Sequence, residues 1–174
     1  LLSVRRIKTA HQPLRVVLDR RLRTGPERQV CAPGEQRTLI VTTLESRSKA
    51  GNMGFAANVE VVGIGDGGPQ WLGRVAAELL NRGICSVFCE PGSTLAGALI
   101  RAGLIDRLDV MVGAKLVGKG RGLLSDIGVE TIGAAMGVRL DVPRLIGGDV
   151  WLSGTLQHAD KTALRDPNAD ATTP

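Results

Sequence analysis

Residues 84–98 read Ile-Cys-Ser-Val-Phe-Cys-Glu-Pro-Gly-Ser-Thr-Leu-Ala-Gly-Ala, and our expectation of the fold starts from this stretch. The apolar run at residues 84–89 predicts a buried strand, and apolar residues repeat at helical spacing over residues 93–102. A strand that passes through a glycine-containing turn into a helix is the building unit of parallel α/β sheets. We therefore expect residues 84–89 to form the central strand of such a sheet.

The same alternation extends outward from this stretch in both directions. Apolar and β-branched runs predict strands, and runs closed by glycine predict helices. The predicted strands are residues 14–18, 38–42, 58–62, 108–112, 138–142 and 150–156, and the predicted helices are residues 44–50 and 71–82. We expect an α/β fold with a mixed, mainly parallel sheet covered on both faces. The last two strands, joined by residues 143–148, should form an antiparallel hairpin at its edge.

Length and composition indicate one globular domain. The chain has 174 residues, of which 43% are hydrophobic and 22% charged. No uncharged apolar run approaches the roughly 20 residues that a membrane span needs, so we expect no membrane association. Residues 158–174 are polar and lack an apolar period, which is typical of a disordered tail. We therefore expect a domain over residues 1–157 and a tail over residues 158–174.

The positive charge is concentrated near the start of the chain. Residues 1–50 hold 11 Lys and Arg against 4 Asp and Glu, whereas the rest of the chain is slightly acidic. Such a basic segment suits nucleic acid, a phosphorylated small molecule, or solubility alone. Aromatic residues make up only 2% of the chain, so base stacking on a single strand is disfavoured. We expect no nucleic-acid partner.

The cysteines and histidines predict neither disulfides nor a metal site. Cys85 and Cys89 would lie about 13 Å apart on one strand, too far to be bridged. Three cysteines that remain free thiols fit a reducing cytoplasm. The chain has only two histidines, and these do not cluster with cysteine.

Three glycine-rich stretches are candidates for binding phosphate. Residues 63–68 have the spacing Gly-x-Gly-x-x-Gly, but Pro69 delays the helix that should hold the third glycine, which favours an ordinary turn. Residues 113–120 have phosphate-loop spacing up to a lysine, but Gly120 stands where Ser or Thr should hold magnesium. The third stretch, residues 90–98, lies between the central strand and a strong helix. There Gly92 allows a close approach, Ser93 or Thr94 can cap the helix, and the free amides favour a phosphate or pyrophosphate. A capped helix beside a surface glutamate explains the same residues.

Four segments together resemble the reductase domain of the bifunctional riboflavin-biosynthesis deaminase/reductase. They are residues 13–19 with 22–24, residues 88–99, residues 102–106 and residues 114–118. The resemblance covers residues 1 to about 157. It implies a three-layer dihydrofolate-reductase-like fold. It also implies NADPH-dependent reduction of the ribosyl side chain of 5-amino-6-(5-phosphoribosylamino)uracil to ribityl.

The resemblance also implies roles for individual residues. Leu2, Arg5 and Glu90 would contact the substrate, with Arg5 suited to its phosphate. The cofactor would bind at the turn formed by Gly92, Ser93, Thr94, Leu95, Ala96, Gly97 and Ala98. Taken alone, Arg5 is one solvated arginine among many. No catalytic proton donor is assigned.

The chain departs from the family pattern at three places. Pro91 replaces a small residue, and Arg20 replaces a Ser or Thr that contacts the cofactor, so that Arg20 could instead face the 2′-phosphate. The family domain also begins earlier, with a strand and a loop that would precede Leu1. A related pyrimidine or pterin reductase and an inactive nucleotide-binding fragment therefore remain alternatives. The intact family member would be a homodimer.

Overall fold

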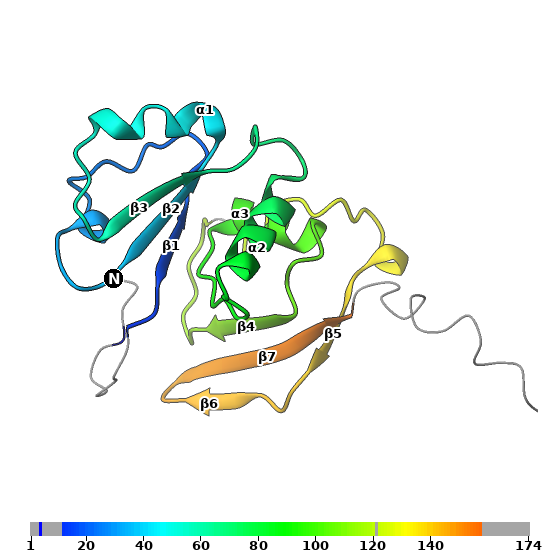
Figure 1. The fold of residues 1–174 in the computed structure, drawn as a ribbon. Helices are drawn as coiled ribbons and strands as arrows, with labels where there is room; N and C mark the ends of the chain where they lie inside the picture. The colour runs from blue at the N-terminus through cyan, green and yellow to red at the C-terminus, as the bar shows by residue number, and fades with distance from the viewer. Residues whose placement is uncertain (1–3, 5–11, 121, 158–174) are drawn as a thin grey trace, which may run out of the picture. The chain divides into compact units, whose positions relative to one another are not determined.

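The computed structural model describes residue 4, residues 12–120 and residues 122–157. The chain divides into two compact units, residues 1–87 and residues 88–174. Each unit has its own sheet (Figure 1). The expected tail, residues 158–174, lies outside the described residues, as do Leu2 and Arg5.

The first unit contains a three-stranded parallel sheet in the order β1-β2-β3. Its strands are β1 (Arg15–Leu18), β2 (Thr38–Thr42) and β3 (Val59–Gly63), within one residue of the predicted runs. Helix α1 (Leu44–Arg47) follows β2, and helix α2 (Trp71–Asn81) follows β3. Two 3₁₀ turns, Gln29–Cys31 and Ala50–Asn52, complete the unit, so the predicted helix over residues 44–50 is shorter than expected.

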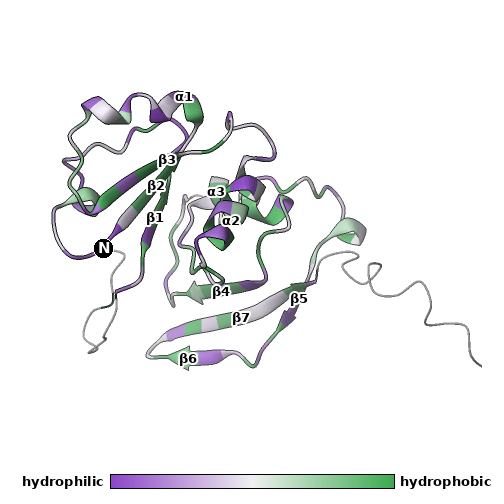
Figure 2. Ribbon diagram, in the orientation of Figure 1, coloured by the Kyte–Doolittle hydropathy of each residue, from purple (hydrophilic) through white to green (hydrophobic). Residues whose placement is uncertain are grey.

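Strand β2 is the centre of the core in this unit. All five of its residues are buried, and successive side chains point to opposite faces of the sheet. On one face Leu39 and Val41 pack against Trp71, Val75 and Leu79 of α2. On the other face Ile40 packs in a cluster with Leu22, Cys31 and Ala50. Apolar residues run along β2 and β3 in Figure 2. The sheet is therefore covered on both faces, as the sequence predicted.

The second unit is built on an antiparallel sheet. Helix α3 (Ser93–Arg101) leads to β4 (Arg107–Val112), followed by a 3₁₀ turn (Ile132–Ala134) and by β5 (Gly137–Leu140), β6 (Arg144–Ile146) and β7 (Asp149–Gln157). The long strand β7 pairs with β4 and also pairs with β5 and β6. The antiparallel pairing of the last predicted strands is confirmed. Strand β6 lies within the connection at residues 143–148, which the sequence did not identify as a strand.

The predicted central strand at residues 84–89 does not form in this structure. Ile84 packs beside the core cluster of α2, and residues 85–89 are exposed and have no strand hydrogen bonds. The boundary between the two units falls between Val87 and Phe88. An apolar run becomes a strand only where neighbouring strands pair with it, and β1 to β3 pair among themselves while β4 pairs with β7. The prediction of this strand was therefore wrong for the described structure.

A glycine in β7 allows the close packing of its sheet. Gly154 is buried and stands opposite Leu108 of β4 and Leu140 of β5. A Cβ atom at this position would lie 2.7 Å from Val138 Cγ1 and 2.9 Å from the Arg139 carbonyl oxygen.

We therefore expect Gly154→Val to lower the free energy of unfolding by about 1–3 kcal/mol, because backbone must shift to admit the side chain. Urea unfolding followed by circular dichroism measures this change. Gly148→Ala is the matched control, since a Cβ there has no neighbour within 4 Å. Equal stability of the two variants would contradict the packing role of Gly154.

Candidate functional site

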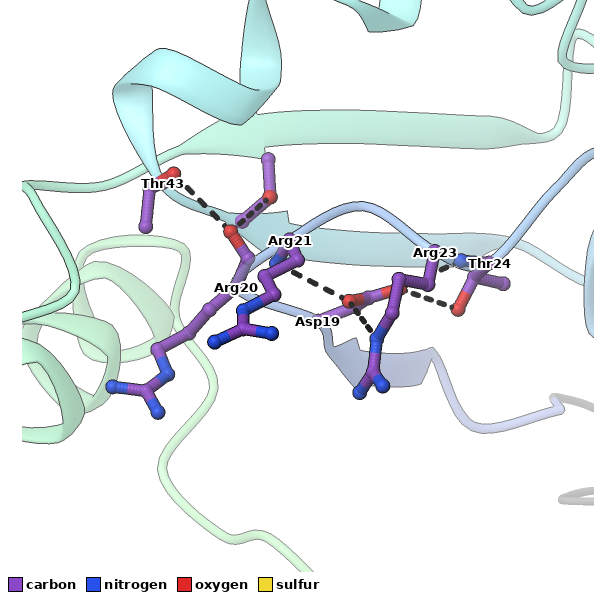
Figure 3. Close-up of polar contacts among 7 residues, drawn as sticks. Asp19, Arg20, Arg21, Arg23, Thr24 and Thr43 are labelled. Atoms are coloured by element: carbon purple, nitrogen blue, oxygen red, sulfur yellow. Dashed lines mark hydrogen bonds and ion pairs between the residues drawn. The ribbon is translucent and has the colours of Figure 1, made fainter.

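The carboxyl ends of β1, β2 and β3 bring three chain segments to one edge of the parallel sheet. Asp19 follows β1, Thr43 follows β2, and the glycine loop at residues 63–68 begins at Gly63, the last residue of β3. This edge is where open α/β sheets bind their ligands. The turn that begins at Asp19 is drawn in Figure 3.

The carboxylate of Asp19 organises this turn. Its side chain is only 8% exposed and accepts hydrogen bonds from Thr24 N at 2.7 Å, from Thr24 Oγ1 at 2.8 Å and from Arg21 N at 3.3 Å. Burial alone would raise the pKa of Asp19, but the hydrogen bonds from residues 21–24 outweigh burial and lower it. Asp19 is therefore an ionised carboxylate whose hydrogen bonds to Arg21 and Thr24 hold the turn closed.

Leu22 fixes the direction of the residues on either side of it. Its φ angle is 49°, in the left-handed region that residues other than glycine rarely adopt. The side chain is buried in the cluster of Ile40 and Cys31, and Leu22 N donates to Asp19 O at 3.0 Å. Since Leu22 points into the core, its neighbours Arg21 and Arg23 are left exposed. Strain of this kind persists only where the surroundings enforce it.

Arg20 joins the three segments. Its carbonyl oxygen accepts hydrogen bonds from Thr42 Oγ1 and Thr43 Oγ1, each at 3.1 Å. Its guanidinium Nη1 donates to the Gly67 carbonyl oxygen at 2.7 Å. The end of β1 is thus tied through one residue to the end of β2 and to the glycine loop. From the sequence, Arg20 is a departure from the family pattern that could face the 2′-phosphate, and nothing in the sequence predicts these contacts with Thr42, Thr43 and Gly67.

The glycine loop at residues 63–68 is a turn. Gly65 and Gly67 have φ angles of 53° and 85°, and Asp66 Oδ1 accepts a hydrogen bond from Gly68 N at 2.9 Å. Helix α2 begins only at Trp71, three residues after the third glycine. A dinucleotide fingerprint would place that glycine inside the helix. The interpretation of this stretch as turn chemistry is confirmed.

In the second unit, α3 begins without a side-chain cap. Gly92 is the N-cap residue, and the first helical hydrogen bond runs from Ala96 N to Gly92 O at 3.0 Å. The expectation that Ser93 or Thr94 caps the helix was wrong, because both lie inside its first turn. The amides of the first turn therefore have no partner within the helix and give its start a partial positive charge. A Cβ at Gly92 would have no neighbour within 4 Å, so space is open there.

The residues predicted to bind the cofactor differ in exposure. Gly92 and Thr94 are exposed, and Ser93, Leu95, Ala96 and Ala98 are half-buried. Gly97 is buried, and a Cβ there would lie 2.6 Å from Ser125 Oγ. Ser125 N donates to Ser93 O at 3.1 Å, and Arg101 donates to the Asp126 carbonyl oxygen. Because Gly97 has no side chain, residues 125–126 can pack directly against α3, a contact that the sequence did not indicate.

Glu90, the predicted substrate ligand, is exposed and lies in the segment before α3 that forms neither helix nor strand.

Within the described residues no group of three or more His, Cys, Asp or Glu side chains is arranged to hold a metal ion. No described helix combines the length and the apolar character that a membrane crossing demands.

The elements of the two units define an α/β protein. Comparison with solved structures shows that its fold is dihydrofolate-reductase-like. Form 2 of RibD from Acinetobacter baumannii superposes with a TM-score of 0.70 at 21% identity, over 89% of this chain and 42% of that one. A Thermotoga maritima diaminohydroxyphosphoribosylaminopyrimidine deaminase/5-amino-6-(5-phosphoribosylamino)uracil reductase superposes with a TM-score of 0.63 at 21% identity. That match covers 86% of this chain and 39% of the other.

The chain belongs to the family of RibD C-terminal domains, whose family model matches residues 1–152. The riboflavin biosynthesis protein RibD of Escherichia coli (strain K12) is 34% identical over 148 residues. That match covers 81% of this chain but only 37% of the Escherichia coli protein. The chain therefore spans less than half the length of this relative.

Proposed function

We propose that this chain is an NADPH-dependent reductase of riboflavin biosynthesis, which reduces the ribosyl side chain of 5-amino-6-(5-phosphoribosylamino)uracil to ribityl. Membership of the RibD C-terminal family supports the reductase class. The name of the Thermotoga maritima structure, whose fold the chain shares, supports the substrate. The observation that best supports NADPH as the cofactor is the start of α3, where Gly92 is the N-cap residue and no side chain caps the helix.

The residues at the start of α3 fit a dinucleotide phosphate. The amides of the first turn point out of the helix start without intrahelical partners, and no side chain at Gly92 blocks an approach. Residues Gly92 to Ala98 would hold the cofactor there, while Gly97 keeps residues 125–126 packed against the helix. When bound, NADPH supplies the hydride for the anomeric carbon of the open, imine form of the substrate.

The protein contributes binding and orientation to this reaction. The exposed carboxylate of Glu90 would accept hydrogen bonds from the hydroxyl or amino groups of the substrate. Arg5, and with it Leu2, would bind at the phosphoribosyl end, as the family resemblance implies. The three cysteines, Cys31, Cys85 and Cys89, are free thiols, in keeping with a cytoplasmic enzyme. A homodimer of the intact protein belongs to the same proposal.

A turnover assay tests this function. We expect the full chain to oxidise NADPH in the presence of the phosphoribosylaminouracil and not in the presence of a dihydropterin. Glu90→Gln should lower kcat/KM by about 10- to 100-fold, because a charged hydrogen bond to substrate is lost. Glu130→Gln is the matched control, since Glu130 is also an exposed glutamate of the second unit. Turnover of the dihydropterin alone would favour the alternative, a pterin reductase.

A further inference from the structure

A segment from later in the chain is bonded to both ends of helix α3. Residues 125–128, which we call the α3 strap, lie between β4 and β5 in the sequence. Ser125 N donates a hydrogen bond at 3.1 Å to Ser93 O, in the first turn of α3. Arg101, the last residue of α3, donates to the Asp126 carbonyl oxygen. The strap therefore holds the helix at its start and at its end.

Gly97 lies midway between these two bonds and lets the strap approach the helix. Ser93, Gly97 and Arg101 are spaced by four residues, so they lie along one side of α3. A Cβ at Gly97 would lie 2.6 Å from Ser125 Oγ and 3.2 Å from Ser125 O. A side chain at this position would therefore push the strap away from the helix.

The strap also has hydrogen bonding of its own. Asp126 Oδ1 accepts a hydrogen bond from Gly128 N at 2.7 Å, which closes a short turn. Gly128 has a φ of 76°, in the left-handed region that glycine adopts readily. The strap is therefore ordered by its own turn as well as by its bonds to α3, and it can brace the helix.

The strap and the cofactor would use different groups of α3. The amides of the first turn point out of the start of the helix, and these are the groups proposed to bind the cofactor phosphates. The strap binds the carbonyl oxygen of Ser93, which points toward the other end of the helix, and the side of the helix at Gly97. The strap thus leaves the first-turn amides available while it fixes the helix that carries them.

We propose that the α3 strap positions the cofactor-binding end of α3, with Ser125, Asp126 and Gly97 as positioning residues that need not touch the cofactor. This inference rests on the function proposed above. Amides bind phosphate oxygens only within about 3 Å, so the helix start must be held in place. A misplacement of about 1 Å in groups that orient a reactant can cost about 100-fold.

The first test introduces a clash and then relieves it. Gly97→Ala should raise the Kd for NADPH by about 10- to 100-fold, because its methyl group displaces the strap. Adding Ser125→Ala removes the Oγ atom that the methyl group meets, so the double variant should recover most of the lost affinity. Gly73→Ala is the matched control, since Gly73 is an interior glycine of α2 whose Cβ would have no neighbour within 4 Å. Alanine favours a helix at both glycine positions, and the control should leave the Kd unchanged.

The second test removes the bond at the far end of the strap. Arg101→Met loses the charged donor to the Asp126 carbonyl oxygen and should raise KM for NADPH by about tenfold with kcat unchanged. A purely structural defect would instead lower kcat, through a smaller fraction of active protein, and leave KM as it was. Arg139→Met is the matched control, because Arg139 is an exposed arginine of β5 in the same unit. It should change neither constant.

Hydrogen exchange of the Ser125 amide reports the strap itself, because this amide is bonded to Ser93 O. We expect faster exchange in Gly97→Ala and in Arg101→Met than in the wild-type chain. Exchange that stays slow in both variants while NADPH affinity falls would overturn the inference, since the substitutions would then act on the cofactor without releasing the strap.

The binding measurements separate this inference from the function on which it rests. If the wild-type chain binds NADPH and Gly97→Ala and Arg101→Met bind it equally well, the strap has no positioning role and the proposed function stands. If Ser125→Ala restores nothing to Gly97→Ala, the methyl group acts on the cofactor directly and the inference is again wrong. A wild-type chain that binds no NADPH would refute the proposed function, and this inference with it.

Discussion

Gly92→Asp is expected to weaken NADPH binding severely while leaving the fold as stable as before or slightly more so. Gly92 is the N-cap of α3, has an ordinary φ of −74°, and has open space where a Cβ would lie. An aspartate there can accept hydrogen bonds from the first-turn amides and complement the helix dipole, which stabilises helices by about 0.5–1 kcal/mol. The same carboxylate occupies the amides that would bind the cofactor and repels its phosphates. We expect the Kd for NADPH to rise by at least roughly 100-fold.

Two measurements on one variant separate binding from folding in this prediction. Nicotinamide fluorescence gives the Kd, and urea unfolding gives the free energy of unfolding. Gly92→Ser is the control, because serine caps the helix without adding charge and should weaken binding less than aspartate does. Unchanged NADPH affinity in Gly92→Asp would show that the cofactor does not bind at the start of α3.

The sequence predicted elements best where burial and pattern agree. Strand β2 was identified at its observed limits because its five residues are all buried and rich in β-branched side chains. Helix α2 was predicted to within a residue because its apolar residues repeat at helical spacing. Residues 84–89 show the same apolar character, yet they form no strand in the structure. Strand pairing depends on partners far away in the chain, which an apolar run cannot specify.

Around the candidate site, too, the sequence predicted the elements that depend on a local pattern and missed those that depend on distant contacts. The start of α3 was located from a local pattern, a glycine between an apolar run and a helix, because helix termini are determined within a few residues. The turn over residues 19–24 depends on contacts between distant segments, such as the hydrogen bonds from the Thr42 and Thr43 hydroxyls to the Arg20 carbonyl oxygen. A leucine in the left-handed region has no sequence signature comparable to that of glycine.

Asp19→Ala is expected to cost about 3 kcal/mol of unfolding free energy, because it leaves the Arg21 and Thr24 amides and the Thr24 hydroxyl without their acceptor. It should also release the strained backbone of Leu22, whose φ is 49°. Urea unfolding followed by circular dichroism measures the loss of stability. Asp66→Ala is the matched control at the same edge of the sheet. Asp66 is exposed and accepts a bond from Gly68 N, so its loss should matter far less.

The pH dependence of stability tests the charge of Asp19 separately from its shape. Its folded-state pKa lies below the ordinary value of about 3.9, so the unfolded chain binds this proton more readily than the folded chain does. The stabilisation by Asp19 should therefore be complete above pH of about 4 and should disappear as the pH falls through the lowered pKa. Asp19→Asn keeps the size of the side chain but has no such titration. The stability difference between the wild-type chain and Asp19→Asn should accordingly shrink on acidification, and a difference that stays constant would mean that the carboxylate acts only by its shape.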